Sequence, residues 1–234
     1  MTAPRIAPPP SAGRSSCRNP GDSPVGCGDN RPRVNLKNVN AIETCSRPLG
    51  DHPTDRRFTY SVDADNRITA VSDSWLQFAV ANGEAGLKRE NVIGTRLADW
   101  IIHDETRHLY LCLMDKVRAE QQALTVHYRC DAPALRRFMQ LQISPGRGGA
   151  IDFISELVRE EERPVPALLD ADRPKGAGQL QMCSWCKKIC VGEDRWLEVE
   201  DAVDAMHLFE AASVPDISHT ICPDCHAAVI ATMN

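Results

Sequence analysis

Two Cys-x-x-Cys pairs near the end of the sequence constrain this chain more than any other feature. Cys183 and Cys186 form the first pair, and Cys222 and Cys225 form the second after 35 intervening residues. Each tight pair brings two sulfurs to one ion, and four thiolates about 2.3 Å from a shared centre make the tetrahedral site that zinc accepts. The sequence therefore predicts a small cysteine-rich module, residues 181–234, that binds one zinc ion per chain.

Other chemistry fits the same cysteines. An iron–sulfur cluster also takes four cysteine ligands, and a redox-sensitive site would release its metal when the thiolates oxidise, with Cys190 as a resolving thiol or an alternative ligand. His219 is expected to donate a hydrogen bond to a thiolate or to replace one cysteine. The stretch ICPDCH, which ends at His226, also matches the pattern of covalent haem attachment, but that interpretation leaves the pair Cys183/Cys186 unexplained.

Composition favours metal chemistry over disulfides. The chain has 10 cysteines, and its first residues, MTAPRIAPPPSAGR, contain no apolar stretch that could act as a secretory signal. We therefore expect a reducing, cytoplasmic location and no membrane span. The net charge is −5, and residues 181–234 contain three basic against nine acidic side chains, so a nucleic-acid partner is not expected.

Composition also divides the chain. Residues 1–56 are rich in Pro, Gly, Ser and Arg and keep no hydrophobic period, which predicts a disordered leader. Residues 57–160 read as a folded domain. Residues 161–180 are charged and then rich in Pro and Gly, so they are predicted to be a linker to the cysteine-rich module.

Alternating apolar and polar residues predict five strands in residues 57–160. FTYSV and RITAV form a hairpin, and LTVHYRC, FMQLQIS and AIDFISELV follow after helical stretches. Between them, Leu109, Leu113 and Val117 recur four residues apart, so one face of a long helix is apolar. The fold class expected is α+β, an antiparallel five-stranded sheet with helices on one face.

One charged cluster stands out in this domain. The stretch RCDAPALRR contains Arg129, Asp131, Arg136 and Arg137. Its charge fits a docking or anion-binding surface, and the preferred interpretation is a solvated hairpin turn with local Arg–Asp pairing.

The first resemblance rests on VDADNRITAVSDSWLQFAVANG and NVIGTRLADWI. In this order they resemble the opening strands, first helix and central G-x-x-L-x-D segment of PAS domains. The resemblance covers about residues 57–160 and implies a sensory module with a ligand pocket between sheet and helices; it does not name the ligand. Light-sensing flavin domains of this family carry a reactive cysteine that IGTRLADW lacks. Haem-binding members take a histidine from the long helix, where His108 stands as the alternative haem ligand.

The second resemblance lies in the cysteine-rich module. CSWCKKI, WLEVE and ISHTICPDC resemble a short module at the ends of bacterial signalling proteins, often next to PAS or response-regulator domains. Thr220 stands where that module usually has Gly, and His226 where it usually has a bulky or aromatic residue. The resemblance implies a signalling context and no particular activity.

These features together predict a non-catalytic signalling protein. No motif of a histidine kinase, a cyclic-nucleotide enzyme, a receiver domain or a helix-turn-helix is visible, so the expected role is a sensor or adaptor that acts on a partner such as a kinase or regulator. A homodimer through the PAS domain is a further expectation. The alternatives are a haem-based gas or redox sensor that uses His108, and a thiol–disulfide enzyme that uses the Cys-x-x-Cys pairs.

Overall fold

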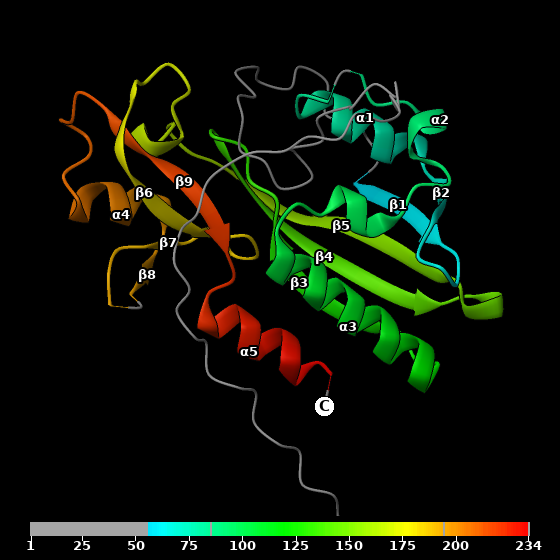
Figure 1. Cartoon of the computed structure of the whole chain (residues 1–234). Coiled ribbons are helices and arrows are strands. Elements are labelled where there is room, and N and C mark those ends of the chain that lie inside the picture. Colours follow the sequence, from blue (N-terminus) through cyan, green and yellow to red (C-terminus); the bar gives the residue numbers. More distant parts are fainter. Residues whose placement is uncertain (1–55, 85, 194, 234) are drawn as a thin grey trace, which may run out of the picture. The chain divides into compact units, whose positions relative to one another are not determined.

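The computed structural model describes residues 56–84, 86–193 and 195–233, so the predicted leader, apart from Arg56, lies outside the described residues. The first sheet has five antiparallel strands in the order β2-β1-β5-β4-β3 (Figure 1). These strands are β1 (Arg57–Val62), β2 (Ile68–Val71), β3 (Leu124–Arg129), β4 (Leu135–Pro145) and β5 (Ile151–Glu162). The fold class expected from the sequence, a PAS-like sheet with helices, is confirmed.

Helical segments connect β2 to β3. They are α1 (Asp73–Ala81), α2 (Arg89–Val92), the 3-10 turn η1 (Leu97–Trp100) and α3 (Asp104–Glu120). Ser72 caps α1, because its hydroxyl accepts a hydrogen bond from the Trp75 N–H at 3.1 Å. The helix α3 ends at Gln121, whose positive φ of 54° turns the chain out of the helix and into β3.

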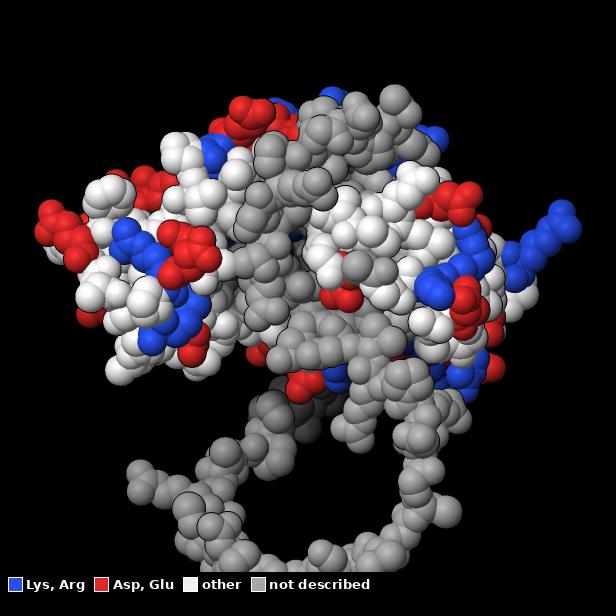
Figure 2. Space-filling model, turned by 90° about the horizontal axis from the view of Figure 1, so that it is seen from above, with Lys and Arg blue, Asp and Glu red and all other residues white. Residues whose placement is uncertain are grey.

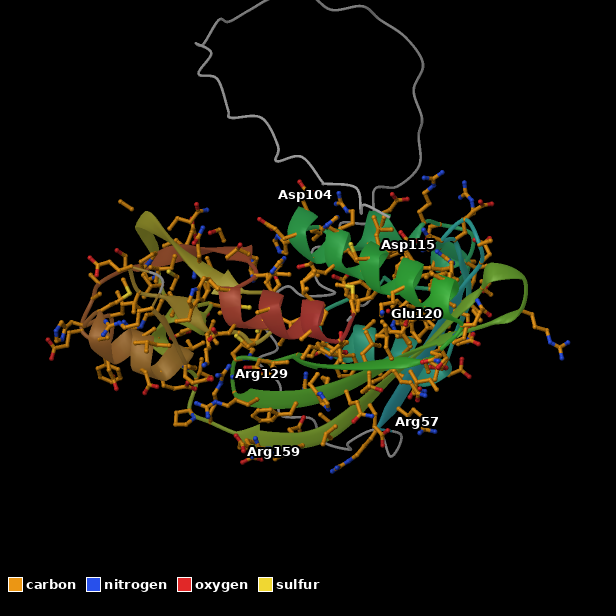
Figure 3. All side chains as sticks on the ribbon, turned by 90° about the horizontal axis from the view of Figure 1, so that it is seen from below. Arg57, Asp104, Asp115, Glu120, Arg129 and Arg159 are labelled. Carbon is orange, nitrogen blue, oxygen red and sulfur yellow. The ribbon has the colours of Figure 1, made fainter. Side chains whose placement is uncertain are left out.

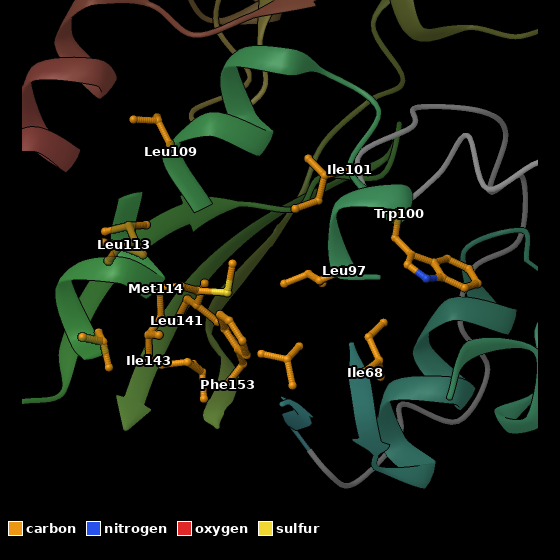
Figure 4. Packing of buried hydrophobic residues seen from close by; sticks show 14 of the residues in the cluster. Ile68, Leu97, Trp100, Ile101, Leu109, Leu113, Met114, Leu141, Ile143 and Phe153 are labelled. Atoms are coloured by element: carbon orange, nitrogen blue, oxygen red, sulfur yellow. The ribbon is translucent and has the colours of Figure 1, made fainter. Parts of the chain in front are cut away.

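The core of this domain lies between α3 and the sheet. Met114 of α3 lies beside Leu141 and Ile143 of β4 in Figure 4, and Leu109 and Leu113 belong to the same buried cluster. Leu113 and Phe153 are fully buried. The predicted apolar face of the long helix is confirmed, because Leu109, Leu113 and Val117 are all buried against the sheet.

The cysteine-rich module has its own sheet of four strands in the order β8-β7-β6-β9, in which β6 and β9 run parallel. The elements are η3 (Ala167–Leu169), β6 (Lys175–Cys183), β7 (Ile189–Cys190), β8 (Trp196–Leu197), α4 (Val199–Ala205), β9 (Val214–Thr220) and α5 (Pro223–Ala231); the turn η2 (Arg147–Gly149) joins β4 to β5.

The stretch predicted as a linker, residues 161–180, contains ordered elements. It carries the end of β5, the buried turn η3 and the first part of β6. Pro164 and Pro166 interrupt hydrogen-bonded structure only locally. Beyond them the apolar residues of η3 belong to one buried cluster with Val199 and Val203 of α4.

The helix between the two cysteine pairs, α4, is short. In WLEVEDAVDAMHLF the apolar residues recur three or four positions apart from Trp196 to Phe209, which predicts a longer helix. Val199 and Val203 are buried in α4 as that pattern requires, but Trp196 lies in β8 and Phe209 is 72% exposed. The helix ends because His207 adopts a positive φ of 55°, and the Leu208 N–H then bonds back to the Val203 carbonyl at 2.9 Å.

The charged cluster at the end of β3 is buried. Asp131 accepts hydrogen bonds from Arg129, which is the predicted local Arg–Asp pairing. Arg129 and Arg137 are only 6% and 1% exposed, so the prediction of a solvated turn is wrong. The reason is that their partners come from distant segments: Arg129 bonds Glu198 at 2.6 Å and Arg137 bonds Glu160 at 2.9 Å. Figure 3 marks Arg129 at this end of β3.

Candidate metal centre and ligand cavity

The four cysteines of the two pairs meet at one point. Cys183 ends β6 and Cys186 follows in the next turn, while Cys222 caps the N-terminus of α5 and Cys225 lies in its first turn. Because β6 and β9 are parallel, with Cys183 opposite Thr220, both pairs emerge at the same end of the sheet. The fold thus brings together residues that are far apart in sequence.

The spacing of the sulfurs fits a tetrahedral ion. All four ligand atoms lie within 4.8 Å of one another, and the sulfurs of Cys186 and Cys222 are 3.8 Å apart. Four sulfurs placed about 2.3 Å from a central zinc at tetrahedral angles are about 3.8 Å apart. The four-cysteine group could therefore hold a metal ion, and it needs little rearrangement to do so.

Main-chain hydrogen bonds prepare one sulfur for a metal. The N–H groups of Trp185, Cys186 and Cys222 point at the Cys183 sulfur at 3.4, 3.5 and 3.3 Å. Hydrogen bonds from the neighbouring thiols of Cys186 and Cys225, and then those from the main chain, lower the pKa of Cys183 well below its usual range.

The pKa values of Cys186 and Cys225 change in the opposite direction. The Cys183 thiolate raises the pKa of Cys186 to about 12, and it likewise raises the pKa of Cys225. Several thiolates at this distance repel one another, so they ionise together only around a cation. The donor set therefore suits a thiophilic dication such as zinc.

The other candidate ligands of this region lie outside that group. Cys190 pairs in β7 with Trp196 of β8, and His226 is exposed on α5. His219 does not join the four sulfurs either; its ring stacks on that of His103 at a centroid distance of 4.7 Å, and its Nε2 atom is buried without a hydrogen-bond partner among the described residues. Burial, and then the positive Lys187, lowers the pKa of His219 to about 4.

A cavity of about 150 Å³ lies inside the PAS-like domain. All five strands of the first sheet, together with α1, η1 and α3, contribute to its walls, and most of its surface is aromatic or aliphatic. The aromatic lining residues are Phe58, Tyr60, Trp75, Phe78, Trp100, Tyr110 and Tyr128. The resemblance predicts a pocket between sheet and helices, and the cavity lies there.

One wall of this cavity comes from the cysteine-rich module. Lys187, the residue directly after Cys186, lines the cavity together with Cys130 of the PAS-like domain. Its side chain is buried, and its ammonium donates to the Ser184 carbonyl at 2.9 Å. Lys187 is not among the site residues predicted from the sequence, because its entry into the cavity depends on how the module packs on β3.

Trp185 joins the same module to β3. Its indole N–H donates to the His127 carbonyl at 2.6 Å, and its own carbonyl accepts from the Arg129 N–H at 2.8 Å. The ring also approaches Tyr110 and Tyr128, two of the cavity residues, at 6.2 and 6.3 Å. Cavity, β3 and cysteine pair are therefore in direct contact.

His108, the histidine of the haem alternative, is in a different place. It is exposed on α3, its Nε2 lies 3.6 Å from the Cys112 sulfur, and it is absent from the cavity lining. The histidine that does line the cavity is His103, at the start of α3. Burial, and then Lys187, lowers the pKa of His103.

No family model and no curated protein matches this chain. Solved structures that match include a domain of an HTR-like protein from Haloarcula marismortui, at 14% identity and a TM-score of 0.35 over 45% of this chain and 100% of that one. An RNA-binding light-oxygen-voltage receptor matches at 15% identity and a TM-score of 0.33, over 44% of this chain and 28% of that one. A sensory box sensor histidine kinase from Vibrio cholerae matches at 9% identity and a TM-score of 0.32, over 46% of this chain and 83% of that one. Similarity at this level assigns no function.

Proposed function

We propose that this protein is a non-catalytic sensor or adaptor. Its PAS-like domain, residues 57–160, binds a small ligand, and the cysteine-rich module, residues 181–234, transmits the bound state to a protein partner such as a kinase or regulator. The observation that carries this proposal is the cavity wall that Lys187 contributes from the module. A ligand in that cavity touches both parts of the chain, so its binding can favour one arrangement of the two.

In this proposal Cys183, Cys186, Cys222 and Cys225 hold one zinc ion. When bound, the ion supplies folding energy by tying β6 to α5, as structural zinc does in small modules. The buried position of Cys183 and Cys222 supports a structural role over thiol exchange, because an attacking thiolate must be accessible. The thiol–disulfide enzyme is therefore the weaker alternative.

The haem alternative is also less well supported. The cavity is about 150 Å³, and an engineered cavity of about that size binds benzene, whereas haem is several times larger. His108 is exposed outside the cavity. A haem-based sensor would need a much wider pocket and another axial ligand.

The remaining parts of the proposal concern location and partners. Among the residues that the structure describes, each helix is too short or too polar to span a membrane.

The surface charge bears on the kind of partner. Figure 2 views the molecule from above the orientation of Figure 1, and on the described part of this face Lys and Arg lie beside Asp and Glu. This mixed charge supports a protein partner over nucleic acid, whose phosphates favour a basic surface. We also propose that the protein is cytoplasmic and that it forms a homodimer through its PAS-like domain. Light scattering, which measures the molar mass in solution, tests the homodimer.

Metal analysis and an absorption spectrum test the first half of this function. Protein purified without added metal is expected to contain about one zinc per chain and to lack visible absorption. A Soret band would establish the haem alternative instead. Iron with broad visible absorption would establish a cluster.

Partner binding tests the second half. Ala79 lines the cavity from α1, and Gln77 of the same helix is exposed. We expect Ala79→Leu, which fills the cavity, to change the amount of a crosslinked partner recovered from native cells, while Gln77→Leu leaves it unchanged. Equal recovery from both variants and the unmodified protein would contradict a sensing role.

A further inference from the structure

The cavity contains a hydroxyl that no protein group satisfies. Thr106 of α3 is 2% exposed, lines the cavity, and its Oγ1 atom has no hydrogen-bond partner among the described residues. Leaving a buried polar atom unpaired destabilises a fold, so such an atom inside a cavity indicates a bound group that completes it.

The Lys187 amine also has unused donors. An ammonium carries three N–H groups, and the structure gives Lys187 one acceptor, the Ser184 carbonyl, and no salt bridge among the described residues. Its side chain is 3% exposed, so bulk water does not complete the set. Lys187 lines the cavity together with Thr106 and with His103, which stands at the start of α3.

Another hydroxyl of the cavity is already paired. The Tyr128 hydroxyl lies 2.6 Å from the Ser155 Oγ, and Tyr60 and Tyr110 line the same cavity. What these residues offer a ligand is the faces and edges of their rings. The cavity thus combines an aromatic wall with free hydrogen-bonding groups near the start of α3.

We infer that this cavity binds a single aromatic ring bearing one hydroxyl or carboxylate oxygen, which accepts a hydrogen bond from Lys187 and one from Thr106. The volume of about 150 Å³ matches one ring with a small substituent, since a cavity of about that size accepts benzene. Aromatic side chains favour an aromatic ring by stacking and edge contacts. The inference rests on the proposed sensing function and specifies its ligand.

The same geometry couples the ligand to the metal centre. Lys187 has a positive φ of 65°, and its N–H donates to the Cys183 carbonyl at 2.9 Å, so the cysteine pair holds the main chain from which this side chain enters the cavity. A ligand on Lys187 therefore stabilises the metal-bound form of the pair. By reciprocity, the ligand is expected to lower the dissociation constant of zinc, and zinc removal is expected to weaken ligand binding by the same factor.

Binding of three simple probes tests this inference on the full zinc-loaded chain. Calorimetry is run with phenol, benzoate and benzene, and fluorine NMR with 4-fluorophenol confirms a single site that Ala79→Leu closes. We expect phenol or benzoate to bind at least about tenfold more tightly than benzene, because each hydrogen bond to a buried charged donor contributes on that scale. Lys187→Met is expected to abolish that difference while benzene binding persists. Lys188 is the adjacent, half-buried residue, so Lys188→Met is the matched control. We expect this variant to keep the preference for phenol or benzoate over benzene.

Three outcomes overturn the inference. They are equal affinity for phenol, benzoate and benzene, an unchanged preference in Lys187→Met, and no binding of any probe. Should Lys187→Met fail to fold, Thr106→Val on α3 replaces it, with the same expected loss of preference. If no probe binds but Ala79→Leu still alters partner recovery, the ligand class is wrong and the proposed sensing function stands.

Discussion

Asp131 lies at the centre of the buried ion pairs that join the PAS-like sheet to α4. Its side chain is 1% exposed and contacts two arginines, Arg129 and Arg163, whose side chains are 7% and 5% exposed. The same carboxylate accepts from the Arg137 N–H at 3.2 Å. We predict that Asp131→Asn destabilises the fold, because Arg129 and Arg163 lose the buried carboxylate that they share and keep only the more exposed Glu198 and Glu200.

The size of this effect follows from burial. Removing one partner of a buried ion pair typically costs about 3–5 kcal/mol. Each kcal/mol lowers the melting temperature of a domain of roughly 150–250 residues by about 2–4 °C. The expected fall is therefore about 6–20 °C, with the Asn variant toward the lower end because its amide oxygen still accepts a hydrogen bond.

Urea unfolding followed by circular dichroism measures the loss. The matched control is Asp115→Asn on α3, whose carboxylate is 78% exposed and 3.7 Å from Arg118 (Figure 3). An exposed pair contributes at most about 1 kcal/mol. If Asp131→Asn loses no more stability than Asp115→Asn, the cluster does not hold the two parts together.

Three further predictions concern the cysteine-rich module. Cys222→Ser is expected to lower the zinc content measured after gel filtration, whereas Cys190→Ser, outside the four-sulfur group, keeps it. The pKa of His219 is lowered to about 4 from 6.5, so the unfolded chain binds a proton on this histidine at a higher pH than the folded chain does. The contribution of His219 to the free energy of unfolding is therefore fully present above about pH 6.5 and is lost as the pH falls toward 4. His219→Gln should flatten this part of the stability profile, whereas His226→Gln should not. Trp185→Phe removes the indole N–H that bonds β3, and it should cost about 0.5–1.5 kcal/mol and speed amide exchange in β3, which mass spectrometry detects.

Local patterns predicted much of this structure because they act over short distances in sequence. Alternation in FMQLQIS placed Met139, Leu141 and Ile143 on one face, and all three are buried. Each Cys-x-x-Cys turn likewise sets two sulfurs by local geometry. The expectation that both pairs meet at one point needed only their matching chemistry, and the structure brings them together.

Long-range partners could not be predicted in the same way. Arg129 belongs to a stretch of charged residues, and such a stretch usually stays in solvent. It is buried here because Glu198 reaches it from 69 residues away. Lys187 is a similar case: its entry into the cavity depends on how the module packs on β3, and no periodicity in CSWCKKI encodes that packing.

The hydrogen bonds of Trp185 have a consequence for handling this protein in pieces. The strand β3 is the last in its sheet, paired on one side only by β4, and Trp185 occupies main-chain groups of Arg129 and His127 on its open side. An unprotected outer strand is a template on which other chains can add strands and aggregate. A chain shortened after β5 would lose this cover, so we expect it to aggregate more readily than the full chain.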